Sequence, residues 1–305
     1  MASAAQWVSA ARPRTLPAAI APVLVGTGAG AAALSAAGQP WTASSWWKAL
    51  LAMIVALALQ VGVNYANDYS DGIRGTDDDH RVGPFRLVGS RSAAPGRVKL
   101  AAFACFGVAA LAGLALAILT AWWLILAGIA CIAAAWFYTG GKHPYGYAGL
   151  GEVFVFVFFG LVAVNGTTFV LAERVSAVSL VLAVGTGLLT CAILVANNLR
   201  DVDTDGQTGK RTLAVLLGAR HTRRLYAAML VAAFVAVALA ALWEPWCLLA
   251  LIALPLAVAP VRTVLGHARL PGGATGPALI PVLGATGMLE VAYAVLLLAG
   301  LLLGR

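Results

Sequence analysis

The chain has 305 residues, of which 61% are hydrophobic and only 10% are charged, and its formal net charge at pH 7 is +8. An ordinary soluble domain carries about 25% charged residues, so this composition excludes a soluble globular protein. With a mean hydropathy of +0.90, the chain is predicted to be an integral membrane protein. Its positive charge then indicates basic cytoplasmic loops and no nucleic-acid partner.

Apolar stretches of about 20 residues predict transmembrane helices, because that length crosses the hydrocarbon core of a bilayer. In chain order we place nine spans, over residues 17–37, 49–67, 98–119, 122–139, 149–171, 176–197, 222–242, 246–261 and 277–303. The prediction is an all-α integral membrane protein of about nine transmembrane helices, with residues 1–305 in a single transmembrane domain. No cleavable signal sequence is expected, since no basic start followed by an apolar core precedes the first span.

Lys and Arg gather in the loops on one side of these spans, and such loops are typically cytoplasmic. With the N-terminus inside, every Lys and Arg lies on the cytoplasmic side except Lys48, Arg174 and Arg305. Tryptophans fall at the predicted outer ends of the spans, where indole rings favour the membrane interface. These are Trp46, Trp47, Trp122, Trp123, Trp243 and Trp246. We expect a multi-pass protein of the cell inner (plasma) membrane with a cytoplasmic N-terminus.

The second and sixth predicted spans both end in aspartate clusters on the cytoplasmic side, within NYANDYSDGIRGTDDD and NNLRDVDTD. The clusters are Asp68, Asp71, Asp77, Asp78 and Asp79, then Asp201, Asp203 and Asp205. At about 100° per residue, Asn64, Asp68 and Asp71 share one helix face. Asn197, Asp201 and Asp205 share another, and Asp203 points away from it. The NxxxD pattern recurs after 133 residues (197 minus 64), which predicts two pseudo-repeated halves followed by a ninth helix.

Stacked carboxylates need cations nearby, because like charges about 5 Å apart repel by roughly 3 kcal/mol at an effective dielectric constant near 20. Mg²⁺ fits best, since it binds through one or two carboxylates together with substrate phosphates. Softer metals favour His or Cys, and the four His residues are dispersed. Basic residues beside the clusters can bind phosphate oxygens: Arg74, Arg81, Arg86, Lys142, Lys210 and Arg211. The pattern predicts a site for a diphosphate with a lipid tail, and the alternative is a set of solvated loop charges.

Other candidate residues lie near the same predicted face. Tyr138, Lys142 and Tyr145 follow the fourth span, where they would place a diphosphate or an aromatic acid. Arg12 opens the first helix and either meets a ligand carboxylate or anchors the helix at the lipid surface. Glu152 and Glu290 are carboxyl groups within predicted spans, where such groups are functional candidates.

The two aspartate motifs together resemble those of the UbiA superfamily of intramembrane aromatic prenyltransferases. Further blocks are similar to the members of that superfamily that act on 1,4-dihydroxy-2-naphthoate in menaquinone biosynthesis. These blocks are RPRTLPAAIAPVLVG, NDYSDGIRGTD, RVGPFR, YTGGKHPYGYAGLGEVFVFVFFG and NNLRDVDTDGQTGKRTLAVLLG. The similarity runs from Arg12 to Gly218 and more loosely beyond. The chain departs from the broad pattern at Gly75, where many members have a third Asp, and Asp77 follows two residues later.

The resemblance implies a Mg²⁺-dependent prenyltransferase with nine helices around a central cavity and the active site on the cytoplasmic side. The metal ligands would be Asp68, Asp71, Asp77, Asp201 and Asp205. The catalytic set would be Asp68, Asp71, Asp201 and Asp205 with Lys142 and Lys210. Substrate-binding residues would be Asn64, Asn67, Asn197, Arg12, Arg81, Arg86, Tyr138, Tyr145 and Glu152.

The implied reaction moves a polyprenyl chain from polyprenyl diphosphate, dissolved among membrane lipids, to 1,4-dihydroxy-2-naphthoate. Diphosphate and CO₂ leave, and demethylmenaquinone is formed. A wall of Phe154, Phe156, Phe158 and Phe159 would exclude water and stabilise an allylic cation, and the alternative is that these rings face lipid or serve packing.

Two alternatives stay open at this point. A related UbiA-type prenyltransferase that accepts 4-hydroxybenzoate, a chlorophyll precursor or a phosphorylated sugar would carry the same aspartate motifs. A transporter would suit the prolines of the first and eighth spans, because broken helices mark substrate paths. Against a transporter, the acidic clusters gather at one face, and Glu290 is the one carboxylate expected deep within a span.

Overall fold

The structure is a computed structural model that describes residues 2–75, 85–266 and 272–304. Within these ranges every regular element is helical, which confirms the predicted fold class. In chain order the first elements are α1 (Ala4–Ala10), η1 (Pro13–Thr15), α2 (Pro17–Ala36), α3 (Ala43–Arg74), α4 (Pro95–Leu119), α5 (Leu124–Phe137) and η2 (Tyr145–Tyr147). They continue with α6 (Gly151–Val155), η3 (Phe156–Val162), α7 (Ala163–Ala172), α8 (Ala177–Arg200) and α9 (Val202–Gln207). The last are α10 (Leu213–Ala240), η4 (Pro245–Ala253), α11 (Leu254–Leu265), η5 (Gly276–Leu279) and α12 (Ile280–Leu303).

Eight helical segments in the described ranges are long and apolar enough to cross a membrane. Each of the nine predicted spans contains a helix, but the fourth, α5, has only 14 residues and falls short of the other eight. The nine predicted spans are therefore all found as helices in the described ranges, with α5 as the shortest of them. Many large apolar side chains of these helices remain exposed, such as Leu111 at 71% and Ile118 at 77%, as expected for surfaces that face lipid.

The second span extends further than its apolar stretch. Predicted over 49–67, it runs to Arg74 and ends at Gly75, which has a φ of 72°. Because glycine adopts this left-handed conformation at little cost, it is the usual residue just after a helix. The extension places Asp68 and Asp71 on the last two turns of α3, on a helix as their spacing predicts.

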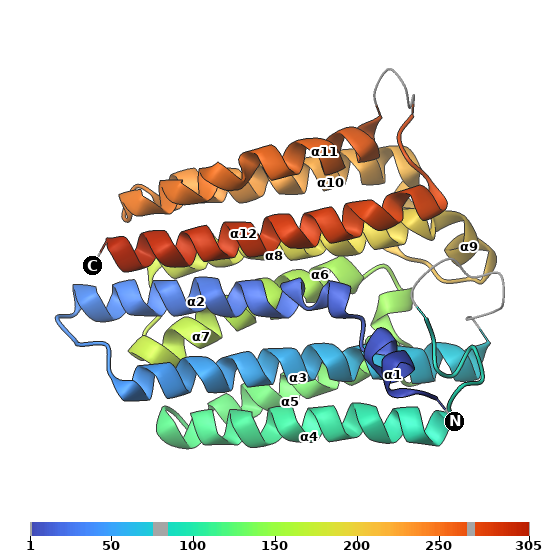
Figure 1. Cartoon of the computed structure of the whole chain (residues 1–305), viewed down its shortest axis with the longest axis horizontal. Helices are drawn as coiled ribbons and strands as arrows, with labels where there is room; N and C mark the ends of the chain where they lie inside the picture. The colour runs from blue at the N-terminus through green and yellow to red at the C-terminus, as the bar shows by residue number, and fades with distance from the viewer. Residues whose placement is uncertain (1, 76–84, 267–271, 305) are drawn as a thin grey trace.

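The helices lie side by side in one bundle (Figure 1). α3 packs against α4, α8 packs against α10, and α2 packs against α7 and α12. The α3–α4 and α8–α10 pairs are the second and third spans of the two predicted halves, so the corresponding helices of each half pair in the same way.

The fifth span is distorted where it crosses α8. It contains a π-helical turn, η3, between α6 and α7, and such turns are often found at functional sites. A Cβ atom built on Gly160 would lie 2.7 Å from the Gly187 Cα atom, and one built on Gly187 would lie 2.9 Å from the Gly160 Cα atom. Only glycine at both positions permits this approach of the two backbones, which brings the middle of the fifth span next to α8.

The two ends of the bundle differ in composition. α1, α9 and the C-terminal end of α3 lie at one end in Figure 1. The opposite end carries the predicted interfacial tryptophans, all of them exposed: Trp46, Trp47, Trp122, Trp123, Trp243 and Trp246. The aspartate clusters and this tryptophan belt are thus separated by the length of the bundle.

Candidate active site

Asp68 lies on the penultimate turn of α3 and is completely buried. Its Oδ2 atom accepts a hydrogen bond from the Leu87 backbone N–H at 2.7 Å, and its Oδ1 atom accepts one from the Val88 N–H at 3.0 Å. One turn later, a Cβ atom on Gly72 would lie 2.4 Å from a Val88 methyl carbon. The turn that contains Leu87 and Val88 therefore sits directly on the backbone of α3.

Asp71 lies at the centre of a polar network. Its Oδ2 atom is 3.3 Å from Arg86 Nη2, and its Oδ1 atom accepts a 2.7 Å hydrogen bond from the Tyr147 hydroxyl. The Tyr147 ring lies 5.4 Å from the Arg74 guanidinium carbon and 5.4 Å from Lys210 Nζ. Both cations are close enough for cation–π attraction to this ring.

The second cluster lies where α8 gives way to α9. Arg200 binds the carboxylate of its neighbour Asp201 through Nε and Nη2, at 2.7 and 2.5 Å. Lys210 Nζ is 3.4 Å from Asp205 Oδ1. Asp203 is exposed, as its position off the helix face predicts. Asp201 and Asp205 are both buried, so the two carboxylates that share a face are also the two that meet basic side chains.

The loop after α5 joins the two clusters. Tyr147 holds Asp71 through its hydroxyl and Lys210 through its ring, and its carbonyl oxygen accepts a 3.1 Å hydrogen bond from the Arg211 N–H. Two segments 133 residues apart (197 minus 64) in the sequence are therefore brought to one site through a single tyrosine.

Two of the three predicted asparagines, Asn64 and Asn67, make hydrogen bonds within the protein. Asn64 Nδ2 donates to the Ala11 carbonyl at 2.9 Å and to Thr15 Oγ1 at 3.0 Å, so it fixes the turn between α1 and α2. Asn67 Oδ1 accepts a 2.7 Å hydrogen bond from the Thr139 hydroxyl. Asn197 is half-buried on α8. The first two hold the site together, and their substrate-binding role stays a prediction.

Arg12 lies in the turn that Asn64 fixes. Its φ is 54°, an uncommon value for a residue with a side chain and one associated with functional sites. Its charge acts on Tyr138 across the site, lowering the pKa of that phenol, but burial and the nearby Glu152 carboxylate outweigh it and raise the pKa of Tyr138 far above its usual range. The Tyr138 hydroxyl therefore keeps its proton.

An aromatic stack leads from this loop into the bundle. The ring centroids of Tyr138 and Tyr145 are 5.5 Å apart, those of Tyr145 and Phe154 are 3.8 Å apart, and those of Phe154 and Phe158 are 6.0 Å apart. Burial also raises the pKa of Tyr145, and its hydroxyl donates to the Ala134 carbonyl at 2.7 Å. Beside the stack, Phe156 packs against Gly187 of α8.

Glu152 is buried beside the stack. Its Oε1 atom accepts a 2.9 Å hydrogen bond from Asn198 Nδ2, and its Oε2 atom has no hydrogen-bond partner within the described residues. A buried carboxylate oxygen without a donor is costly, which marks this atom as a place for a donor on a ligand. Lys142 is exposed on the loop.

Two predicted site residues, Asp77 and Arg81, lie outside the described residues. The structure adds three residues to the site: Tyr147, Asn198 and Arg200. Asn198 and Arg200 stand within the NNLRD motif, but their side chains point at Glu152 and Asp201 through contacts that spacing alone does not predict. Tyr147 carries no signal in the sequence beyond being an aromatic residue near basic ones.

The donor set fits a hard cation in its chemistry. Carboxylates and amide oxygens dominate, and Mg²⁺ uses one or two carboxylates with phosphates and waters. No group of three or more His, Cys, Asp or Glu side chains close enough to hold a metal occurs within the described ranges. Asp71 and Asp205 are one buried carboxylate from each cluster, and both have oxygens of the kind that a hard cation binds.

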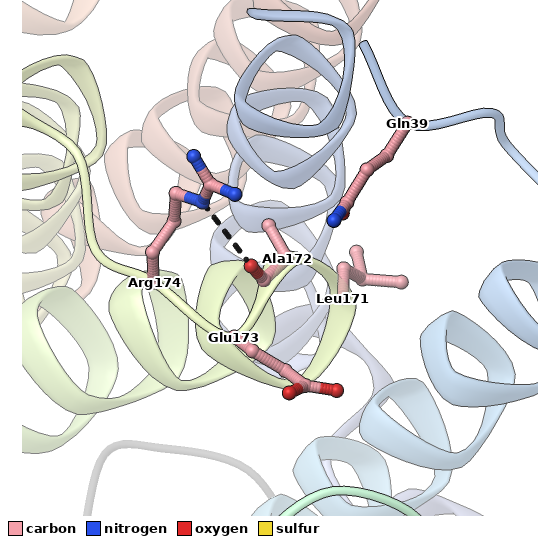
Figure 2. A pocket seen from close by; sticks show the side chains of 5 residues that line it. All are labelled: Gln39, Leu171, Ala172, Glu173 and Arg174. Atoms are coloured by element: carbon pink, nitrogen blue, oxygen red, sulfur yellow. Dashed lines mark hydrogen bonds between the residues drawn. The ribbon is translucent and has the colours of Figure 1, made fainter. Parts of the chain in front are cut away.

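A pocket of about 260 Å³ lies far from this site, at the tryptophan-bearing end. Gln39, Leu171, Ala172, Glu173 and Arg174 line it (Figure 2). Arg174 Nε donates to the Ala172 carbonyl at 3.4 Å, just after the C-terminal end of α7. None of the residues predicted to take part in chemistry lines this pocket.

Comparison with known proteins agrees with these features. The profile of the UbiA prenyltransferase family matches residues 19–272. The chain is 57% identical to 1,4-dihydroxy-2-naphthoate octaprenyltransferase of Mycobacterium leprae, over 97% of this chain and 95% of that protein. It is 55% identical to the Mycobacterium tuberculosis protein of the same name, over 100% and 99%, and 37% identical to the one from Escherichia coli, over 85% and 84%.

Solved structures share the fold. A UbiA homolog from Archaeoglobus fulgidus bound to GPP and Mg²⁺ superposes with a TM-score of 0.68 at 13% identity, covering 96% of this chain and 99% of that one. A UbiA homolog from Aeropyrum pernix gives a TM-score of 0.64 at 14% identity, over 92% and 97%. The chain therefore shares its helical fold with these UbiA homologs.

Proposed function

The chain belongs to the UbiA prenyltransferase family, and we propose that it transfers a polyprenyl chain from polyprenyl diphosphate to 1,4-dihydroxy-2-naphthoate. The observation that carries the choice of acceptor is 57% identity over 97% of the chain to a relative named for that substrate. The site described above supports it, because both reactants are anions and the site gathers cations around four buried aspartates. These are Asp68, Asp71, Asp201 and Asp205.

In this reaction the bond between the allylic carbon and the diphosphate oxygen breaks, and diphosphate takes the electron pair. The ring carbon that carries the carboxylate forms the new carbon–carbon bond, and the carboxylate then leaves as CO₂. No oxidant takes part, so the product is demethylmenaquinone in its quinol form.

Arg86, Arg200 and Lys210 would bind the leaving diphosphate. Each contacts an aspartate within 3.4 Å, and all three are cations that suit phosphate oxygens. Asp71 and Asp205 would hold Mg²⁺, which when bound neutralises negative charge on the diphosphate and makes it a better leaving group. Lys142, exposed on the neighbouring loop, would contact the diphosphate from the aqueous side.

The aromatic stack would line the path of the prenyl chain. Aromatic faces attract cations, so Tyr145, Phe154 and Phe158 suit a carbon that becomes positive when the diphosphate leaves. Tyr138 retains its proton, as its raised pKa indicates, and so donates to an anion instead of competing as a nucleophile.

Glu152 would bind the acceptor. Its buried Oε2 atom lacks a donor within the described residues, and a ring hydroxyl of the naphthoate supplies one. Arg12, held in its turn by Asn64, would meet the acceptor carboxylate. We also propose that the enzyme lies in the inner (plasma) membrane with its N-terminus and this site facing the cytoplasm, because the basic loops gather at the same end as the aspartates.

The test is an assay of the detergent-purified protein with one labelled polyprenyl diphosphate and a panel of acceptors. We expect prenylated naphthoate, released CO₂ and released diphosphate, all lost on chelation of divalent metal and restored by Mg²⁺. A transporter releases no diphosphate. Turnover of 4-hydroxybenzoate with none of the naphthoate would refute the acceptor and leave the family intact.

Two matched aspartates of the second cluster serve as the internal control. Asp205→Asn should lower the rate by about 100-fold or more, since groups that stabilise transition-state charge contribute on that scale. Asp203→Asn should retain nearly full activity, because that side chain is exposed and away from the site. Equal small losses in both variants would show that the cluster is loop charge.

A further inference from the structure

Both oxygens of the Asp68 carboxylate are bound by the protein backbone. They accept hydrogen bonds from Leu87 and Val88, at 2.7 and 3.0 Å. The side chain is completely buried, and its neighbour in the motif, Asp71, faces Arg86 and Tyr147 instead. Two aspartates three residues apart on one helix therefore do different things.

The segment that donates hydrogen bonds to Asp68 is a compact turn. The Ala93 N–H donates to the Leu87 carbonyl at 3.0 Å, and the Arg91 N–H donates to the Val88 carbonyl at 2.9 Å. Leu87 is fully buried in a cluster with Ala66 and Val98, from α3 and α4. The turn is thus rigid in itself, and Asp68 fixes where it lies on α3.

Gly72 gives the turn a second, independent contact with the helix. A Cβ atom there would lie 2.4 and 2.5 Å from side-chain atoms of Val88, a distance that real side chains do not reach. Asp68 and Gly72 are four residues apart and so lie on the same helix face. Polar attraction at one position and close approach at the other hold the turn in one place.

The position of Arg86 depends on this docking. Arg86 directly precedes Leu87, is buried, and reaches Asp71 with Nη2 at 3.3 Å from Oδ2. We propose that Asp68 is a positioning residue: it clamps the backbone of the Arg86–Val88 turn onto α3 and thereby presents the Arg86 guanidinium to the diphosphate, instead of binding the metal ion as its motif position suggested. The inference rests on the proposed function, because it concerns how the same site binds its donor.

The first experiment uses the unmodified protein and needs no turnover. Amide hydrogen exchange is followed at Leu87 and Val88, in detergent, with and without Mg²⁺ and inorganic pyrophosphate. If Asp68 is a clamp, both amides are protected without ligand and stay protected when the two are added. Fast exchange without ligand, or faster exchange when Mg²⁺ and pyrophosphate are added, overturns the proposal, because a clamp must hold both amides in the free and the ligand-bound state.

The second experiment compares two unrelated ways of loosening the clamp. Asp68→Asn replaces the charged acceptor, and Gly72→Ala pushes Val88 away without touching any carboxylate. Both should speed exchange at the two amides by at least tenfold and raise the KM for polyprenyl diphosphate, while the Mg²⁺ concentration for half-maximal rate stays within about twofold of the unmodified value. Asp71→Asn should do the reverse, raising the Mg²⁺ requirement and leaving the amides protected.

The outcomes separate the possible failures. An Asp68→Asn enzyme with protected amides and a raised Mg²⁺ requirement would make Asp68 a metal ligand and sink the proposal. If neither clamp variant yields folded protein, the exchange result on the unmodified protein decides. Since exchange is read without any acceptor, a failure of the naphthoate assignment leaves this measurement valid.

Discussion

Arg86, Arg200 and Lys210 each lie against an aspartate of the site, so in the absence of substrate the site is internally neutralised. Buried carboxylates are costly unless paired, and these pairs offset that cost. When a diphosphate enters, the same cations can turn to its oxygens and leave the carboxylates for Mg²⁺. The same basic side chains would thus neutralise the aspartates in the free protein and bind the diphosphate in the complex.

Tyr147 is the residue whose replacement best tests this network. Tyr147→Phe removes the hydrogen bond to Asp71 and keeps the ring between Arg74 and Lys210. A hydrogen bond to a charged group contributes about 1.5–3 kcal/mol, so we expect kcat/KM for the donor to fall by about 10- to 100-fold. Steady-state kinetics at saturating naphthoate measure it.

The matched control is Tyr226→Phe. That hydroxyl also makes a 2.7 Å hydrogen bond, to Thr286, but in the core between α10 and α12. It should lower thermal stability and leave the KM for the donor unchanged. A Tyr147→Phe enzyme that matches the unmodified protein would show that the hydroxyl does not position Asp71.

At this scale the sequence predicts residue types better than partners. Asp71, Asp205 and Glu152 can be identified from the sequence as candidate site residues, because carboxylates at the ends of apolar helices are unusual and often functional. The contacts of Tyr147 and Asn198, and the hydrogen bonds from the backbone to Asp68, cannot be identified in this way. They depend on how a loop folds over a helix end, which the periodicity of the sequence does not reveal.

Among the helices, the crossing of η3 and α8 tolerates the least change in side-chain size. Gly160→Ala would place a methyl group 2.7 Å from the Gly187 Cα atom and 2.8 Å from the Ala183 carbonyl oxygen, and neither backbone can yield cheaply. Overpacking of this kind costs about 1–3 kcal/mol, so the thermal unfolding midpoint in detergent should fall by several degrees.

Gly166→Ala is the control in the same span, since nothing lies within 4 Å of its Cβ position. Its midpoint should equal or exceed that of the unmodified protein, because alanine favours helix over glycine. Equal midpoints for the two variants would mean that the crossing is looser than described.

Apolar stretches predict where the helices are but not where they end. Hydropathy places the second span at 49–67, whereas α3 continues to Arg74, because tertiary contacts of Asp68 and Asp71 keep polar turns helical. The π turn of η3 likewise has no signal in hydropathy, since it arises from the packing of Gly160 against α8.

For the whole molecule, orientation is the open prediction. Ala43 and Thr208 are exposed at opposite ends of the bundle. In a protein whose four cysteines are replaced by alanine, a membrane-impermeant maleimide applied to intact cells should label Ala43→Cys and spare Thr208→Cys. Permeabilised cells provide the control, in which Thr208→Cys should react. Labelling of Thr208→Cys in intact cells would invert the topology.

The short helix α5 has a consequence for the surrounding bilayer. Its 14 residues span about 21 Å at 1.5 Å per residue, whereas the hydrocarbon core is about 30 Å thick. Lipids beside α5 must therefore shorten, or water must follow the chain inward, at a small cost for each ångström of mismatch. The loop that carries Tyr138 and Tyr147 starts where α5 ends, so the site lies next to this short helix. A lipid-borne diphosphate bound at the proposed site would therefore meet its cations beside a locally thinner part of the membrane, while its tail stays among the acyl chains.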